Sequence, residues 1–568
     1  MIEDRGNGAG GGDLRAHIAV VGAGPGGIVT ALEAAAHGLD VVLVESGGPT
    51  YDPSIQFLSE AASWDEDHHA PMPLAVRRQV GGTSVIWGGR CVPYDPVDFA
   101  VRPFVPGSVW PVGYEEIAEY FPRACDWLVC GRPVFDAADI PGLPREIVPG
   151  LHDGLVKSSD LERWSLPTDF GTTYGEQLAA SRRVRLVTGL TATEIVSEPG
   201  GGRADHLRCR TLGGMEVAVR ADAFVIACGG LEGTRLLMGS TGPDGGELGN
   251  HSDQLGRWYM AHAEGVIAEA HFSTDPKLTV YDYERDIDGV YVRRRFTFPE
   301  CVQLDQELPN IAGWLTNPEL PDASHGSGPL SFVYLALDSP LGPKVAPDAQ
   351  RLSLTGARIP GTPYGGSHRS PKGEHVRNVL RHPASTTRFI SGFGVRRLLA
   401  RTRRAPGFFV PQPDNVYPFQ FHGEHLPNPE SRVTRSRELD VLGRPKLDID
   451  LRFSPADVDG VVRAHEQWDA HFRSAGVGHL EYLHDDPHEA VERRLGGGFH
   501  QIGTTRMSSS PAAGVVDADL AVHGVPNVFV ASSSTFVTSG QANSTFMIVA
   551  FAIRLADHLR EVVRPKVR

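Results

Sequence analysis

Residues 18–45 contain the sequence feature that most restricts how this 568-residue chain can fold. The apolar run IAVV is followed by GAGPGG, by the alanine-rich stretch IVTALEAAAHG and by a second apolar run, DVVLVESG. This succession predicts a strand, a tight glycine turn, a helix and a second, parallel strand. The N-terminal part of the chain is therefore expected to form an α/β domain with a parallel sheet.

The glycine turn has the spacing G-x-G-x-x-G at Gly22, Gly24 and Gly27. The first glycine allows the turn, the second lets the backbone approach a pyrophosphate, and the third lets helix and strand pack closely. Glu45 ends the second strand, where a carboxylate accepts hydrogen bonds from a ribose and repels a 2′-phosphate. These four residues predict a dinucleotide site, and a glycine turn without a ligand is the alternative.

Two later parts of the chain repeat the same order of elements. Residues 184–196 and 221–240 read as strands followed by a glycine turn and a helix, and residues 525–534 and 543–563 read as a strand and a long final helix. We therefore predict an α/β, Rossmann-like FAD-binding domain assembled from N-terminal, middle and C-terminal segments, at 14–100, 180–260 and 491–568. The turn itself does not distinguish FAD from NAD, but this dispersal favours FAD, because NAD-binding domains are usually contiguous.

The remaining segments, 101–179 and 261–490, have a different pattern. Runs such as VYVRRRFTF, YPFQFHGEHL and RPKLDIDLRF alternate with period two, which is typical of half-buried antiparallel strands. We predict an α+β substrate-binding domain with cap segments and a largely antiparallel sheet. Its basic part, 341–410, reads as a mobile surface loop or as a patch that faces a partner. Residues 1–13 read as a flexible tail.

The charge and the cysteines limit the classes of function. A formal net charge of −15 argues against a nucleic-acid partner and disfavours an anionic membrane surface. The six cysteines form no CxxC pair, and the N-terminus has no apolar run typical of a signal peptide. No run of about 18 apolar residues is present, so we predict a cytoplasmic enzyme with a small-molecule substrate and no membrane partner. The oligomeric state is not predicted.

Four segments together resemble the glucose–methanol–choline (GMC) flavoprotein oxidoreductases. They are HIAVVGAGPGG…VVLVESG, VGGTSVIWGGRCVPYDPVDF with WPVGYEEIAEYF, ADAFVIACGGLEGTRLL, and HQIGTTRM…GVVDADLAVHGVPNVFVASSSTFVTSGQANST. The resemblance covers nearly the whole chain. Within the family the chain is most similar to the pyranose-oxidase branch and to bacterial glycoside 3-oxidases, some of which act on C-glycosides.

The resemblance implies FAD-dependent oxidation of a secondary hydroxyl of a sugar or glycoside to a ketone, at C3 or C2 of the pyranose. Hydride goes to the flavin, which oxygen or another acceptor then reoxidises. Two alternatives stay open. One is an FAD-dependent alcohol oxidase of secondary metabolism, for instance of an aminoglycoside hydroxyl, and the other is a non-redox GMC lyase.

Residue by residue, the resemblance makes His500 the catalytic base and Asn543 its partner. Histidine suits proton abstraction because its ordinary pKa is near neutrality. The Asn543 amide can both donate and accept a hydrogen bond, although an N-cap of the last helix is its alternative role. His422 and Glu424 share one face of a predicted strand, which lines the sugar pocket or faces solvent, with His425 on the other face.

The resemblance also gives the other cofactor contacts. Thr83, Ser84 and Trp87 are expected along the flavin ring. The remaining contacts are expected at the adenine, ribose, pyrophosphate or ring, and they are Ala192, Cys228, Ser532 and Thr545. We interpret Cys228 as a small packing residue and not as a redox group.

One position departs from the family. Fungal pyranose oxidases bind FAD covalently through a histidine just before the tryptophan of their GG-x-S-x-H-W segment, and this chain has Ile86 there. Isoleucine cannot form that bond, so we predict non-covalent FAD. We predict no metal site, because the 23 histidines include no HxxxH or HExxH spacing with a suitable third ligand.

Overall fold

The computed structural model describes residues 1–6, 12–143, 146–346, 348–359, 361–362, 366 and 368–563. Its largest sheet has seven strands, of which six run parallel and the edge strand β21 runs antiparallel. In sheet order the strands are β1 (Ile2–Asp4), β8 (Val184–Thr188), β4 (Val41–Val44), β3 (Ile18–Val21), β12 (Ala223–Ile226), β22 (Val525–Val530) and β21 (Ala521–Val522).

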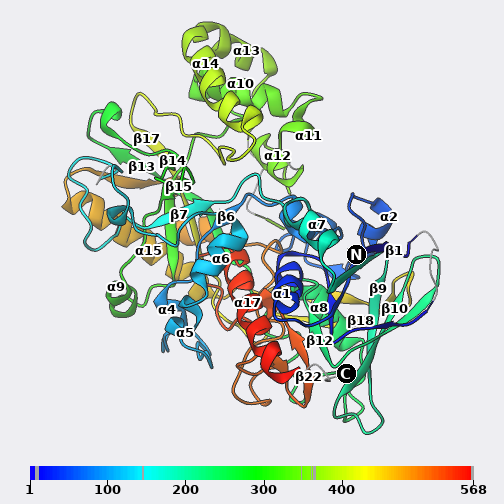
Figure 1. The fold of residues 1–568 in the computed structure, drawn as a ribbon. Coiled ribbons are helices and arrows are strands. Elements are labelled where there is room, and N and C mark those ends of the chain that lie inside the picture. The colour runs from blue at the N-terminus through cyan, green and yellow to red at the C-terminus, as the bar shows by residue number, and fades with distance from the viewer. Residues whose placement is uncertain are drawn as a thin grey trace.

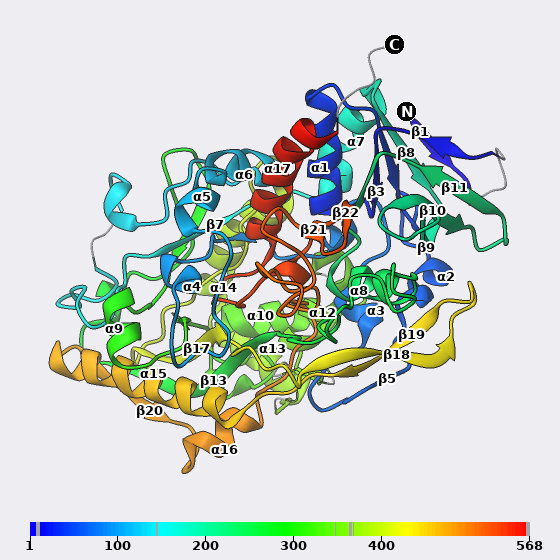
Figure 2. The same ribbon diagram turned by 90° about the horizontal axis from the view of Figure 1, so that it is seen from below.

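Two helices from opposite ends of the chain pack side by side on this sheet. These are α1 (Pro25–Ala36), drawn in blue, and α17 (Thr545–Val562), drawn in red (Figures 1 and 2). Nearly all residues in the first half of α17 are buried, so this half lies inside the domain core, and toward the C-terminus only one face of the helix stays buried. A third helix, α8 (Gly230–Met238), directly follows β12.

The predicted fold class is confirmed. The large sheet takes β3 and β4 from the N-terminal segment, β8 and β12 from the middle segment and β22 from the C-terminal segment. One apolar cluster joins their buried residues into a common core. A four-stranded sheet beside it contains β2 (Leu14–Arg15), β11 (Glu216–Arg220), β10 (Ala204–Arg210) and β9 (Thr191–Ser197).

The expected antiparallel sheet is also present. It contains, in order, β16 (Ile311–Leu315), β17 (Val416–Glu424), β13 (His262–Phe272) and β20 (Gly478–Tyr482). The long helix α15 (Pro455–Ser474) packs against β20, and its buried Trp468 and Phe472 join the apolar core of this sheet. Alternation of buried and half-buried residues along β13 is the period-two pattern of a strand with one covered face.

Two smaller sheets cross the predicted domain boundaries. One contains β14 (Glu284–Arg285), β15 (Tyr291–Arg294), β7 (Leu161–Trp164) and β6 (Arg90–Cys91), and the other contains β18 (Arg432–Leu439), β19 (Pro445–Asp450) and β5 (Ser63–Trp64). Strands β5 and β6 thus come from the predicted segment 14–100 but pair with strands of the other segments.

The prediction of a flexible tail at 1–13 is wrong for its first residues. Residues 2–4 form β1, which pairs in parallel with β8 at the edge of the large sheet, and the Arg5 side chain is buried. Backbone pairing with β8 outweighs the polar, glycine-rich composition of residues 1–13 as a whole. Residues 7–11 lie outside the described part of the chain.

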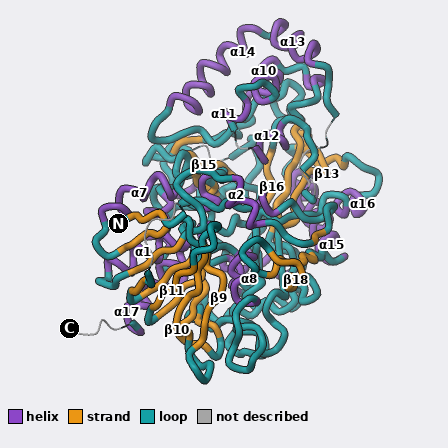
Figure 3. The backbone as a smooth tube through the Cα atoms, turned by 90° about the vertical axis from the view of Figure 1, so that its right-hand side faces the viewer, coloured by secondary structure: helices purple, strands orange, loops and turns teal. Residues whose placement is uncertain are grey.

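The interpretation of the basic segment 341–410 as a mobile surface loop is wrong for most of its described residues, which are helical, whereas the alternative of a patch that faces a partner stays a prediction. It forms α11 (Gly342–Val345), α12 (Asp348–Leu354), α13 (Lys372–Arg381), α14 (Pro383–Phe389) and a further helix at Ile390–Leu399. Together with α10 (Gly328–Leu337), these helices gather at one end of the molecule (Figures 1 and 3). Tyr334 of α10 stacks on His375 of α13 at 4.2 Å between ring centroids. This packing depends partly on α10, which ends just before the basic segment begins.

The remaining described helices connect these layers. They are α2 (Pro53–Gln56), α3 (Met72–Ala75), α4 (Pro96–Phe99), α5 (Tyr114–Ala118), α6 (Phe121–Leu128), α7 (Phe170–Ala180), α9 (Glu300–Asp305) and α16 (Pro487–Glu492). Among the described residues, no helix combines the length and the apolar character needed to cross a bilayer.

Candidate active site

A cavity of about 1000 Å³ runs along the carboxyl ends of β3, β4 and β12. Its walls reach from the glycine turn at Gly22 to His500 and Asn543. The N-termini of α1 and α17 both contribute to its lining. Its volume is at the upper end of small-molecule sites, and helix N-termini favour anionic groups.

Of the three glycines in the G-x-G-x-x-G turn, only Gly24 leaves space for a ligand beside its Cα atom. A Cβ atom on Gly22 would lie 2.6 Å from the Cys228 Cα atom, and one on Gly27 would lie 1.8 Å from the Gly22 carbonyl oxygen. At Gly24 the nearest protein atom would be 3.8 Å away, so this residue turns an open backbone toward the cavity. The turn therefore fits a pyrophosphate at the N-terminus of α1.

Glu45 is buried in the cavity wall and braces this turn. Its carboxylate accepts hydrogen bonds from the backbone N–H groups of Ala23 (2.8 Å) and Gly47 (2.9 Å). Burial raises the pKa of the Glu45 carboxyl, and the backbone N–H groups and Arg78 partly offset that rise. Each carboxylate oxygen has a second lone pair, so Glu45 can still accept from a ribose hydroxyl.

The segment at residues 81–90 forms the wall between the two ends of the cavity. The short helix at Gly82–Val85 presents Thr83 to the cavity, while the Ser84 hydroxyl donates to the Gly81 carbonyl oxygen at 2.6 Å. The Trp87 indole N–H donates to the Thr168 carbonyl oxygen at 2.8 Å. These two hydrogen bonds fix the position of the segment, so it can form a rigid wall against a flat aromatic cofactor.

The structure brings nearly all predicted cofactor residues together. Those that line the cavity are Gly22, Gly24, Glu45, Thr83, Ser84, Trp87, Ala192, Cys228, Ser532 and Thr545. Gly27 lies beneath the turn and acts on its packing. Ile86 also lines the cavity, at the position where a covalent histidine link occurs in the family members named above.

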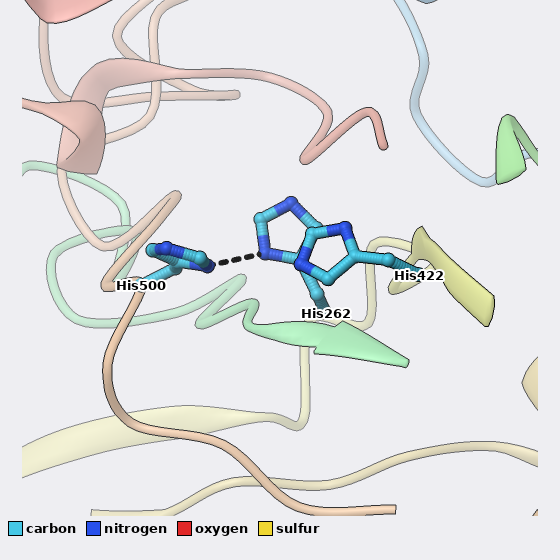
Figure 4. A group of neighbouring side chains, drawn as sticks. All are labelled: His262, His422 and His500. Carbon is cyan, nitrogen blue, oxygen red and sulfur yellow. Dashed lines mark hydrogen bonds between the residues drawn. The ribbon is translucent and has the colours of Figure 1, made fainter. Parts of the chain in front are cut away.

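At the other end of the cavity, four polar side chains form a continuous hydrogen-bond chain. An Arg90 guanidinium N–H donates to Asn543 Oδ1, and Asn543 Nδ2 lies 2.9 Å from His500 Nε2. The second ring nitrogen of His500, Nδ1, lies 2.9 Å from His262 Nδ1 (Figure 4). Arg90 itself is anchored by Glu162, whose Oε2 accepts from Arg90 Nε at 2.5 Å.

This chain determines which nitrogen of His500 carries a proton. A guanidinium only donates, so Asn543 must accept with Oδ1 and donate with Nδ2. His500 Nε2 is then the acceptor, and Nδ1 carries the proton that is donated to His262. The unprotonated nitrogen is therefore the one beside Asn543, at the wall of the cavity.

The surroundings also keep His500 neutral. Burial, together with the positive charge of Arg90, lowers the pKa of His500 to about 4. Burial likewise holds the pKa values of His262 and His422 well below the ordinary value. At neutral pH His500 is thus a free base. Glu162 pairs with Arg90 and also with Arg293, so net positive charge remains beside the His500 ring.

Asn543 does not cap the last helix. The helix α17 begins at Thr545 with Ser544 at the N-cap position, and the Asn543 side chain instead contacts Arg90 and His500. The alternative role as an N-cap is therefore wrong.

The predicted sugar contacts, by contrast, do not line the cavity. Glu424 is buried and binds Arg102 through two bonds of 2.7 Å. His422 lies behind His262, with ring centroids 4.3 Å apart, and its Nδ1 atom bonds the Gln541 carbonyl oxygen. The prediction is wrong because alternation fails at this end of β17, where all of residues 421–424 are buried.

Arg90 and His262 were missed in the sequence. Arg90 directly follows the VGGTSVIWGG segment, and this position next to predicted flavin contacts could have indicated a residue of the site. His262 gave no such signal, because 238 residues separate it from His500.

His262, His422 and His500 together place ring nitrogens within 4.8 Å of one another, from segments that local spacing could not connect (Figure 4). The hydrogen bond between His500 and His262 and the nearby charge of Arg90 favour a neutral hydrogen-bonded cluster over a cation site there.

Comparisons with known proteins agree with this geometry. Residues 427–552 match the family model described as GMC oxidoreductase, and residues 17–54 match the model described as FAD binding domain. Paromamine 6′-oxidase of Streptomyces fradiae is 24% identical, and the match covers 95% of this chain and 90% of that protein. The 6‴-hydroxyparomomycin C oxidase of Streptomyces lividus is also 24% identical, over 95% and 91%.

Among solved structures, a fungal aryl-alcohol oxidase has the same fold. The TM-score is 0.52 at 16% sequence identity, and the alignment covers 96% of this chain and 99% of that one.

Proposed function

We propose that this chain is a GMC oxidoreductase, the family whose model matches residues 427–552, that it binds FAD without a covalent bond, and that it oxidises a hydroxyl group of a sugar or glycoside. The preferred site is a secondary hydroxyl of the pyranose, C3 or C2, which becomes a ketone. The observation that carries the proposal is the unprotonated Nε2 atom of His500 beside Asn543 in the cavity wall. FAD, when bound, supplies the acceptor for the hydride.

The protein's own residues account for the proton. Asn543 Nδ2 donates a hydrogen bond to His500 Nε2 at 2.9 Å, so the two side chains are hydrogen-bonded to each other in this structure. A hydroxyl group is both donor and acceptor, so a substrate can replace this bond by accepting from Asn543 and donating to His500. His500 then takes the hydroxyl proton as the carbon loses hydride.

Asn543 and Arg90 favour the same step through charge. Negative charge develops on the substrate oxygen as its proton leaves, and the Asn543 amide N–H group stabilises that charge. The bond from Arg90 to Asn543 Oδ1 polarises the amide and keeps its N–H side turned to the reacting group. Arg90 is therefore a positioning residue, and His500 and Asn543 are the catalytic residues of this proposal.

A second substrate class is an aminoglycoside hydroxyl. Two relatives bear names of aminoglycoside oxidases. The cavity lining includes the exposed carboxylate of Asp348, which lies 3.4 Å from Arg351 and would also suit a cationic substrate. The assignment to the pyranose-oxidase and glycoside 3-oxidase branch rests on the His500–Asn543 pair, because the names of the relatives above describe other activities.

The test is anaerobic bleaching of the bound flavin with glucose, a C-glycoside and an aminoglycoside. Bleaching by glucose or the C-glycoside supports the first class, and bleaching by the aminoglycoside alone supports the second. No bleaching by any alcohol, with FAD bound, would favour the non-redox lyase instead. Repeating the turnover with oxygen and with a quinone identifies the electron acceptor.

The role of His500 is tested in the same assay. His500→Ala should abolish bleaching while FAD stays bound, and the matched control His488→Ala changes an exposed histidine of α16. Unchanged bleaching in His500→Ala would refute the proposed base.

A further inference from the structure

A second group of histidines lies on the outer face of the antiparallel sheet, away from the cavity. In the pairing of β13 with β20, His271 lies directly opposite His479, and Glu269 lies directly opposite Glu481. The alternation of each strand places these four residues on the less buried face. Two imidazoles and two carboxylates therefore form adjacent cross-strand pairs.

Three of these side chains already converge. Ligand atoms of His271, His479 and Glu481 lie within 4.8 Å of one another, and His271 Nε2 is 3.4 Å from Glu481 Oε2. The two imidazole rings are nearly parallel, with centroids 5.0 Å apart and 18° between planes. The His271 Nε2 atom is shielded from solvent and makes no hydrogen bond within the described part of the chain.

The charges around this group differ from those around His500. Glu269 and Glu481 are like charges directly opposite each other, which is an unfavourable cross-strand arrangement. A bound cation would relieve that repulsion, whereas the cluster beside His500 has the fixed positive charge of Arg90 next to it. Of the two histidine groups, this one has the electrostatics of a cation site.

We propose that His271, His479 and Glu481 bind a divalent transition-metal ion of the Zn²⁺ type at the surface of β13 and β20. Zn²⁺ takes imidazole nitrogen and carboxylate oxygen at about 2.0–2.2 Å, so its tetrahedral ligands lie about 3.4 Å apart. The distance between His271 Nε2 and Glu481 Oε2 has that value. Water would complete the coordination, and the two imidazoles select against Mg²⁺ and Ca²⁺, which prefer oxygen.

A metal ion at this site would stabilise the edge strand β20 of the antiparallel sheet. Strand β20 is last in the sheet order and pairs only with β13 among the described strands. A metal bridge between His271 and the two β20 ligands joins these strands through side chains as well as backbone. An ion that binds only the folded state raises thermal stability, and above its Kd the gain grows with the logarithm of the ion concentration.

The test uses the tag-free holoenzyme after treatment with EDTA and buffer exchange. Titration with ZnCl₂ in a calorimeter should give one equivalent bound, together with an upward shift of the thermal midpoint. The variants His479→Gln and Glu481→Gln should each weaken Zn²⁺ affinity at least tenfold and remove the midpoint shift. Their side chains are partly or fully exposed, so the metal-free variants should keep the wild-type midpoint.

His488→Gln is the matched control, because His488 is an exposed histidine beside two carboxylates but has no second histidine in its group. It should bind Zn²⁺ like the wild type. A Cu²⁺-loaded sample should show coupling to two imidazole nitrogens in its electron paramagnetic resonance spectrum. The proposal is overturned if Zn²⁺ does not bind, or if binding survives in His479→Gln and is lost in His262→Asn.

Discussion

The replacement of His262 by leucine tests the hydrogen-bond chain most directly. In the wild type, the His500 Nδ1–H group donates a hydrogen bond to His262 Nδ1, with 2.9 Å between the two nitrogens. Leucine removes this acceptor and leaves the His500 N–H group buried without its partner. That loss raises the free energy of the active tautomer, the one in which Nε2 is free to take the substrate proton.

The size of the effect follows from the cost of an unsatisfied buried donor, about 1–3 kcal/mol. At about 1.4 kcal/mol for each factor of ten, flavin reduction should slow about 5- to 140-fold. His262→Asn removes the same ring, and with it the stacking on His422, but supplies an amide oxygen as acceptor. We expect this variant to recover most of the lost rate.

The assay is anaerobic stopped-flow reduction of the flavin by a substrate identified in the panel above. The ratio of flavin to protein absorbance and the thermal midpoint show whether each variant keeps FAD and its fold. Equal rates for His262→Leu and the wild type, at full FAD content, would refute the role of His262. Equal losses in the leucine and asparagine variants would show that the ring itself, and not its hydrogen bond, is needed.

Three further predictions follow from the same site. Because burial and Arg90 lower the pKa of His500 to about 4, kcat/KM should be flat above about pH 5 and fall only near pH 4, where His500 becomes protonated; a fall centred near pH 6.5 would contradict this. Gly27→Ala places a Cβ atom 1.8 Å from the Gly22 carbonyl oxygen, so it should lower FAD content and destabilise the fold by about 1–3 kcal/mol or more. Gly175→Ala, where a Cβ atom meets nothing within 4 Å, is its control, and equal FAD content in both variants would count against the role of the turn. Acid precipitation should release the flavin into solution, since Ile86 cannot form the histidine link, and colour that stays in the pellet would disprove non-covalent binding.

Much of the fold was predictable because its signals are local. The strand, glycine turn and helix at residues 18–45, and the period-two runs at 290–298 and 417–426, each depend on residues close together in sequence. The N-terminal strand was not predictable in this way. Residues 2–4 become a strand because the edge of β8, about 180 residues later, offers them hydrogen-bond partners.

The residues of the candidate site also differ in whether a local sequence signal could predict them. The α/β fold class and the candidates His500 and Asn543 could be predicted from the residues alone, because glycine turns and family motifs are short stretches of chain. The surroundings of these two residues became known only from the folded chain. It brought Arg90 and His262 to either end of the pair, turned Glu424 into a buried partner of Arg102 and removed His422 from the cavity wall. Proton position and pKa depend on burial and on charges from distant segments, and no local pattern encodes those.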